Sequence, residues 1–141
     1  MANICNELKI LRKICPLRHA RGEDRLANQV AQYLKALTLS EKLKAVWFHV
    51  PNESVVSERM DVVRIKRKQA LGMINGAPDF VVTNGAKTVF IELKTDKGRQ
   101  TESQKMFEKW CCKCGITYEI CRSVDDVSLV LVESGLMEGS N

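Results

Sequence analysis

The sequence lacks any long apolar run: no stretch of roughly 18 consecutive apolar residues is available to span a membrane. Its N-terminus alternates charged and apolar residues, so it holds no uninterrupted signal-peptide core. Neither an internal repeat nor a linker rich in Pro, Gly and Ser divides the chain. We therefore expect a cytoplasmic protein without membrane contact, folded as a single domain over residues 1–141.

Cysteine is not scarce, with six residues, but its spacing matches no two-pair zinc pattern. Four of the six lie near one another in the sequence, at Cys111, Cys112, Cys114 and Cys121. In a reducing compartment they are expected to be free thiols. We interpret them as small buried or half-buried hydrophobic residues, with a zinc-stapled interaction protein as the alternative.

The bulk composition suits one globular domain with a real core, because 45% of the 141 residues are hydrophobic. The formal net charge is +5. A modest basic excess attracts phosphate-backbone partners without proving that the protein binds nucleic acid.

The strongest helical pattern covers residues 22–39, while residues 1–20 are expected to be weakly helical at best. Its apolar stripe consists of Leu26, Val30, Tyr33, Leu34 and Leu37. Glu23 continues this stripe one turn earlier, so its carboxylate is expected to face inward or along the rim of a cleft. The alternative is an acidic residue that only favours the positive end of the helix dipole.

A strand is predicted over residues 45–50, and a helix from Ser57 to about residue 71, with Gly72 as its terminator. Met60, Val63, Arg67 and Leu71 are expected to mark one face of this helix. The helix also carries a dense basic patch at Arg64, Lys66, Arg67 and Lys68. Such a patch either grips phosphates or forms a solvated helix face.

Two further strands, over residues 79–83 and 87–93, are predicted to form a hairpin around a two-residue type I′ turn at Asn84-Gly85. Thr101 begins the next helix with Gln104 as its capping-box partner, and Gly115 ends it. A strand over 116–121 and a helix over 123–133 follow. This order predicts an α/β fold, with a mixed central β-sheet flanked by helices.

The hairpin brings chemistry-bearing side chains to one face of the sheet. A two-residue loop would place Asp79 opposite Phe90 and diagonal to Glu92, about 7–8 Å away at the backbone. Lys94 shares this face, whereas Val89, Ile91 and Leu93 face the core. Two carboxylates beside an ammonium are the groups that bind a divalent cation and position a water for phosphodiester hydrolysis.

With Gly76-Ala77-Pro78-Asp79 and Glu92-x-Lys94 in this order, the chain resembles the PD-(D/E)XK nucleases, and more narrowly the VRR-NUC (virus-type replication-repair nuclease) family. The resemblance covers roughly residues 20–122 and leaves residues 1–20 as an N-terminal extension. Its other matching residues are Glu23, His49-Val50-Pro51-Asn52-Glu53 and Thr101-x-x-Gln104.

The resemblance implies a restriction-endonuclease-like core and a Mg²⁺- or Mn²⁺-dependent DNA endonuclease that acts on branched DNA. The implied metal ligands are Asp79, Glu92, the Leu93 carbonyl and Glu23. Lys94 and Gln104 complete the catalytic set, with Gln104 expected to fix Lys94 or the attacking water. The residues expected to contact DNA are Arg59, Arg64, Lys66, Arg67, Lys68, His49 and Asn52.

Stand-alone members of the family resemble homodimeric Holliday-junction resolvases, and a two-fold symmetric junction suits a symmetric pair of subunits. The cytoplasmic location holds equally for a phage-encoded protein that acts in a host cell. Three alternatives stay open: a nuclease for flaps or other branched DNA, a restriction-like enzyme, and a nonenzymatic DNA-binding module on a nuclease fold.

Overall fold

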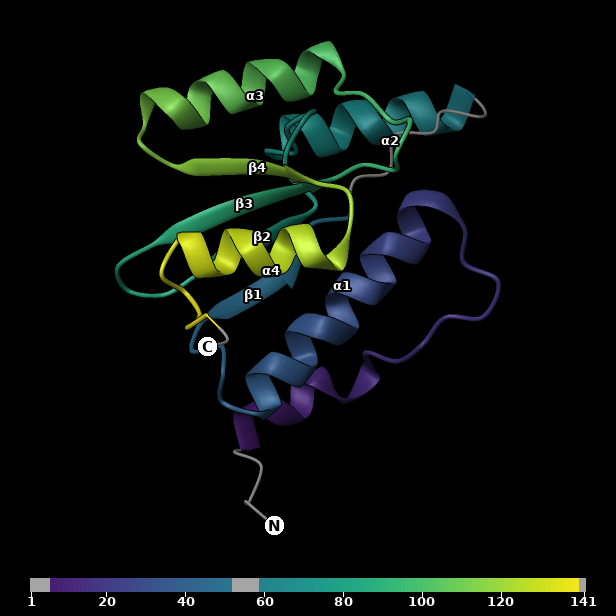
Figure 1. Cartoon of the computed structure of the whole chain (residues 1–141). Helices are drawn as coiled ribbons and strands as arrows, with labels where there is room; N and C mark the ends of the chain where they lie inside the picture. Colours follow the sequence, from purple (N-terminus) through teal and green to yellow (C-terminus); the bar gives the residue numbers. More distant parts are fainter. Residues whose placement is uncertain (1–5, 52–58, 140–141) are drawn as a thin grey trace.

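The computed structural model of the chain describes residues 6–51 and 59–139, and its centre is one four-stranded sheet (Figure 1). The strands are β1 (Val46–His49), β2 (Phe80–Thr83), β3 (Thr88–Leu93) and β4 (Thr117–Cys121), in the order β1-β2-β3-β4. The β1–β2 and β2–β3 pairs are antiparallel and the β3–β4 pair is parallel. The predicted α/β architecture with a mixed central sheet flanked by helices is therefore confirmed.

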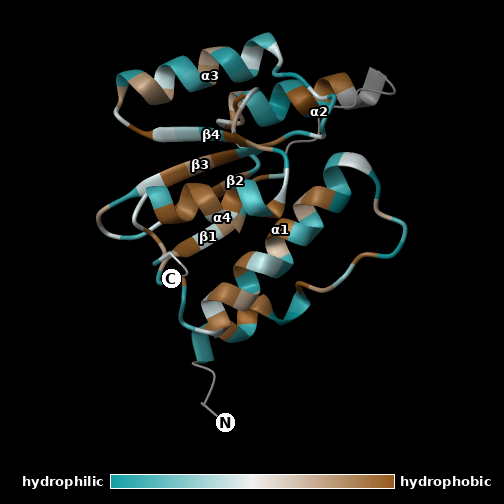
Figure 2. Cartoon of the chain, viewed as in Figure 1, coloured by the Kyte–Doolittle hydropathy of each residue, from teal (hydrophilic) through white to brown (hydrophobic). Residues whose placement is uncertain are grey.

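One face of the sheet is covered by α1 (Gly22–Leu39) and α4 (Val124–Glu133), and the hydrophobic core lies between them and the strands. Four residues of the predicted α1 stripe are buried there with the core face of β3, and Tyr33 packs against them partly buried. The buried residues are Leu26, Val30, Leu34 and Leu37 of α1 and Val89, Ile91 and Leu93 of β3. Figure 2 shows β3 and much of α4 in the hydrophobic colour. The 22–39 helix and the core face of β3 are thus confirmed.

The opposite face is covered by α3 (Glu102–Lys113). Its Phe107 ring lies 6.0 Å from Phe90 of β3 and 6.2 Å from Tyr118 of β4. Thr101 caps the helix in the predicted capping box, and Gly115 follows the helix with a φ of 69°. Because α3 packs on the face that carries Phe90, its first turn lies near the next residue on that face, Glu92.

The turn between β2 and β3 differs from the prediction. Thr83 pairs with Thr88, so the loop has four residues, 84–87, instead of two. Gly85 is not among the glycines with positive φ, which a type I′ turn would require. The Asn84 side chain instead accepts hydrogen bonds from the backbone N–H groups of Ala86 and Lys87, both at 2.8 Å, and closes the longer loop.

This register is shifted by two residues from the predicted one, and an even shift leaves every side chain on its predicted face. Phe80 pairs with Ile91. Continuing the register by one residue places Asp79 directly opposite Glu92 instead of diagonal to it. The observed four-residue loop therefore brings the carboxylates of Asp79 and Glu92 closer together than the predicted two-residue loop would.

The helix predicted over 57–71 is α2 (Arg59–Ala70); its predicted cap, Ser57, lies outside the described residues. Gly72 follows with a φ of 107°. Val63 and Leu71 were expected on one face of this helix and are 69% and 77% exposed, because the core does not extend to α2. Near the N-terminus, the weak helical tendency takes the form of a 3₁₀ helix, η1 (Asn6–Lys13).

Within the described ranges, no helix has the length and apolar character needed to cross a bilayer.

Candidate active site

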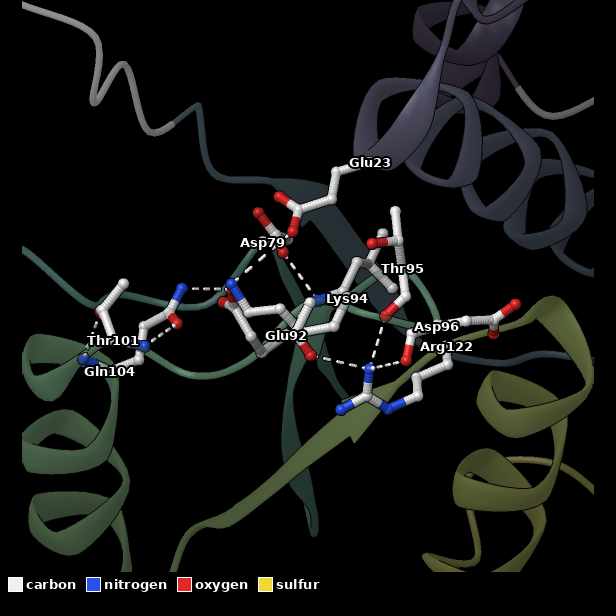
Figure 3. A network of polar contacts seen from close by, with 11 residues as sticks. Glu23, Asp79, Glu92, Lys94, Thr95, Asp96, Thr101, Gln104 and Arg122 are labelled. Atoms are coloured by element: carbon white, nitrogen blue, oxygen red, sulfur yellow. Dashed lines mark hydrogen bonds and ion pairs between the residues drawn. The ribbon is translucent and has the colours of Figure 1, made fainter.

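Asp79 lies immediately before β2, and its carboxylate is directed at β3. Asp79 Oδ2 accepts a hydrogen bond of 2.7 Å from the backbone N–H of Leu93. Glu92 precedes Leu93 on the same strand and is only 3% exposed. The predicted pair of carboxylates is therefore brought together at the end of the hairpin (Figure 3). Leu93 contributes its N–H to this contact, and a ligand role for its carbonyl stays a prediction.

Lys94 follows β3 and is 6% exposed, which is unusual for a lysine. Its Nζ lies 3.6 Å from Glu92 Oε1 and 3.6 Å from Glu23 Oε1. Glu23 belongs to the first turn of α1, and its side chain is 51% exposed. Glu23, which continues the apolar stripe of α1, thus lies at the rim of the cluster, as the sequence predicted.

Gln104 joins the cluster from the first turn of α3. Its Nε2 donates a hydrogen bond to Glu92 Oε1, and its Oε1 accepts one of 2.9 Å from the Thr101 N–H. The sequence suggested that Gln104 would fix Lys94 or a water in addition to capping the helix. The structure instead shows it holding Glu92, while it also completes the cap.

The pKa values of both carboxyl groups are raised. Burial, and then the charge of Asp79, raise the pKa of Glu92 to about 8. Burial also raises the pKa of Asp79 above its ordinary range, and the Leu93 N–H opposes this shift. Three carboxylates therefore share the single ammonium of Lys94, and the cluster is short of positive charge.

The donor set fits a divalent cation. Glu92 Oε2 is buried and finds no hydrogen-bond partner among the described residues. A buried carboxylate oxygen without a partner is costly, and a hard cation with oxygen ligands removes that cost. Across the described ranges, no group of three or more His, Cys, Asp or Glu side chains forms a ready-made metal cage. The fit therefore rests on Asp79 and Glu92, with Glu23 at the rim.

The position of Gly76, in the loop before Asp79, accepts only glycine. It has a φ of 89°, and a Cβ at this position would overlap the Ser103 carbonyl in the first turn of α3. The chain leading to Asp79 therefore runs directly against the helix turn that holds Glu92. The position of Asp79 therefore depends on the position of the α3 turn that holds Glu92.

Arg122 is a site residue that the sequence analysis missed. It follows β4, and its Nη1 donates to the carbonyl oxygens of Thr95, Asp96 and Gly98 in the loop after Lys94 (Figure 3). Because β3 and β4 are parallel, Lys94 and Arg122 leave the sheet at the same edge. The available signal was a cation directly after the strand predicted over 116–121, but the neighbour of that strand in the sheet was not predicted.

His49 lies beside the cluster, whereas the expected basic DNA contacts lie on α2. His49 Nδ1 is 2.8 Å from the Asp79 carbonyl oxygen, and the side chain is exposed. The side chains of Arg64, Lys66, Arg67 and Lys68 are exposed on α2. The residue Asn52 and the side chain of Arg59 lie outside the described part of the structure.

The cysteine cluster separates into two kinds of residue. Cys111 and Cys121 are buried, and burial raises the pKa of the Cys121 thiol to about 12. Cys112 and Cys114 are exposed. The described cysteines are free thiols, as expected. Their interpretation as buried or half-buried hydrophobic residues is right for Cys111 and Cys121 and wrong for Cys112 and Cys114.

Comparison with known proteins identifies the family of the chain. Residues 28–125 match the VRR-NUC domain family, and this range holds every residue of the cluster except Glu23. A solved structure named as a VRR_NUC domain protein superposes with a TM-score of 0.56 at 22% identity, over 86% of this chain and 93% of that one, and shows a shared fold. No curated protein matches the sequence. With most of its length matched, the chain belongs to the VRR-NUC domain family, and membership of this family implies a nuclease-type function.

Proposed function

We propose that the protein is a metal-dependent, structure-selective DNA endonuclease of the Holliday-junction-resolving type. One arrangement carries the proposal: the opposed carboxylates of Asp79 and Glu92, with Lys94 buried beside them and Glu92 Oε2 lacking a partner among the described residues. A purely structural Glu–Lys pair would leave no buried carboxylate oxygen unsatisfied.

Asp79 and Glu92 would hold Mg²⁺ or Mn²⁺, with the Leu93 carbonyl and Glu23 as further oxygen donors. Such a cation, when bound, lowers the pKa of a water and polarises the scissile phosphate. Lys94 orients the attacking water and stabilises the negative charge that develops on the phosphate oxygens. Gln104 holds Glu92 in place through its hydrogen bond to Oε1.

The DNA is gripped through its phosphates by the exposed basic residues of α2, with Arg59, His49 and Asn52 as additional contacts. Contacts of this kind position a duplex without reading its sequence, which suits an enzyme that recognises shape. Reversing the charges of Lys66 and Lys68 is expected to weaken DNA binding and to flatten its dependence on salt. An unchanged salt slope would remove α2 from the interface.

A symmetric dimer would make two matched incisions in a four-way junction, because both have a two-fold axis. Sedimentation of the protein, alone and with junction DNA, tests this part of the proposal. A species with one chain per junction would contradict it.

The central test is a cleavage panel of four-way junctions, flaps and linear duplex with Mg²⁺ or Mn²⁺. Asp79→Ala and Lys94→Ala are expected to abolish cleavage; the matched controls Asp125→Ala and Lys113→Ala change exposed residues of the same types away from the cluster. Cleavage by either cluster variant at the level of its control would sink the assignment. Preferential cutting of flaps would retain the nuclease and reject the resolvase.

Metal binding has a readout that does not depend on cleavage. Calorimetric titration with Mn²⁺ is expected to detect binding to the unmodified protein and to Asp125→Ala, and no binding to Asp79→Ala. Equal binding by all three proteins would place the cation elsewhere.

A further inference from the structure

A cavity of about 510 Å³ lies beside the candidate active site, between the segment before α1, α1 itself and the end of β1. Its wall is apolar where Ala27 and Ala31 of α1 face Phe80. Its rim is polar, with Arg18, Asp24 and His49 among the lining residues. The volume and the mixture of an apolar wall with few polar groups are typical of small-molecule sites.

The outer wall of the cavity is held in place by α1. Asn28 Oδ1 accepts a hydrogen bond of 3.0 Å from the Leu17 N–H, and Asn28 Nδ2 donates one of 2.9 Å to the Cys15 carbonyl. Lys35 Nζ donates to the Ile14 carbonyl at 2.8 Å. Backbone groups of this N-terminal segment, which lies outside the family match, are therefore tied to the helix.

The cavity adjoins the carboxylate cluster at the end of β1. His49, which lines the cavity and pairs with Phe80 in the sheet, has its Nδ1 2.8 Å from the Asp79 carbonyl oxygen. The side chains of Phe80 and Asp79 point to opposite faces of the sheet, so the cavity and the cluster meet at this strand end. A ligand in the cavity would therefore lie beside the place where the cluster would hold a phosphodiester.

The polar groups of the rim suit the edge of a nucleobase. A carbonyl oxygen only accepts hydrogen bonds, so His49 Nδ1 carries the proton and Nε2 of the neutral ring is an acceptor. Asp24 adds carboxylate acceptors, and Arg18 adds a cation. These acceptors and the exposed imidazole ring of His49, which lies 5.0 Å from the buried ring of Phe80, match the amino and imino donors and the π-face of a base.

On the basis of the nuclease function above, we propose that this cavity receives one unstacked nucleobase from the nucleotide next to the cleaved phosphodiester. Branch points and flaps supply such a base more readily than a regular duplex, because the energy needed to unstack it is lowest where pairing is already broken. The N-terminal segment would thus contribute to the choice of substrate, while the cluster carries out the chemistry.

The experiment uses a set of junction DNAs that carry 2-aminopurine at successive positions around the branch point, with EDTA present so that no cleavage occurs. Binding by the unmodified full-length protein is expected to raise the fluorescence several-fold at one of these positions, since the probe brightens when it leaves the stack. No rise at any of these positions would overturn the proposal, and this readout needs neither a variant nor a mapped cut.

Ala27→Leu fills the cavity, and Ala36→Leu makes the same change on an exposed part of α1. Ala27→Leu is expected to abolish the fluorescence rise and to weaken junction binding about tenfold, within the range of one lost base stack. Ala36→Leu is expected to behave as the unmodified protein. Equal signals from the two variants would overturn the proposal.

The same panel separates this inference from the proposed function. Loss of the fluorescence signal in a protein that still cleaves junctions rejects the base pocket and keeps the nuclease. Absence of cleavage on every DNA, with the fluorescence rise intact, rejects the nuclease function and keeps the pocket. Circular dichroism of Ala27→Leu checks its fold, and His49→Gln, which retains a donor for the Asp79 carbonyl but loses the ring, repeats the test.

Discussion

Gln104 Nε2 donates a hydrogen bond to Glu92 Oε1, so the first turn of α3 holds a carboxylate at the end of β3. The same side chain accepts from the Thr101 N–H and completes the capping box. One residue thus serves the stability of a helix and the geometry of the candidate site. These two roles can be separated by mutation.

Gln104→Ala is expected to reduce DNA cleavage at least tenfold, because Glu92 loses its only described hydrogen-bond donor other than the nearby Lys94. Loss of the hydrogen bond from the Thr101 N–H, one half of the capping box, should also lower the free energy of unfolding by about 1 kcal/mol. Cleavage rates and urea unfolding of the variant measure the two effects. The matched control is Thr101→Ala, which removes the cap alone; an equal loss of activity in both variants would show that Gln104 acts only through the helix.

The stability of the protein in a metal chelator is expected to depend on pH through Glu92. Its pKa is raised from an ordinary value of 4.5 to about 8, so the folded state retains a proton that the unfolded state releases. This contribution is complete below pH 4.5 and is lost as the pH rises to about 8, at no more than about 1.4 kcal/mol per pH unit. The raised pKa of Asp79 adds a loss of the same sign.

Urea unfolding in EDTA across this pH range, compared with Glu92→Gln, measures the effect. The difference in unfolding free energy between the two proteins should shift in favour of the variant as the pH rises. Glu119→Gln, an exposed change on β4, is the control. A difference that does not vary with pH would contradict the assignment of the shift to Glu92.

Gly76→Ala is expected to destabilise the fold by more than 2 kcal/mol and to impair cleavage. The new Cβ would overlap the Ser103 carbonyl, in addition to the strain of a left-handed backbone. Gly115→Ala shares the positive φ but has nothing within 4 Å, so it isolates the backbone strain at about 1–2 kcal/mol. If thermal unfolding and cleavage are affected equally in both variants, the close approach to α3 has no importance of its own.

Arg122→Gln is expected to lower kcat about tenfold with little effect on KM. The guanidinium joins three carbonyl oxygens of the loop that links Lys94 to the helix of Gln104, and the amide cannot span them. Lys113→Gln removes the same charge from the end of α3 and serves as the control in steady-state cleavage. A loss that falls on KM instead would assign Arg122 to DNA binding.

The sequence was most informative where a pattern repeats over several turns. The α1 stripe predicted Gly22–Leu39 and carried Glu23 to the rim of the site, because helical spacing is fixed by backbone geometry. The hairpin turn was wrong, since the Asn84 side chain closes a four-residue loop that the Asn-Gly pattern does not reveal. The shared face of Asp79 and Glu92 was still predicted, because the alternation of a strand has a period of two.

Contacts between segments far apart in the sequence could not be predicted from local sequence patterns. Arg122 reaches a loop 24–27 residues away, and this partnership depends on the parallel pairing of β3 with β4. The role of Gly76 likewise depends on where the first turn of α3 lies. Exposure of Val63 and Leu71 was missed because helical periodicity identifies a face without telling what covers it.

The turn that joins α1 to β1 separates the active cluster into two pieces of chain. Glu23 lies before it and the other members of the cluster follow it; the exposed Glu41 adopts a φ of 61° within the turn. A chain divided there would give one fragment with four of the fourteen buried residues of the core and another with the other ten and most of the candidate site. Neither fragment buries its apolar face alone, so cleavage by such a split enzyme would report on the reassembly of its two parts.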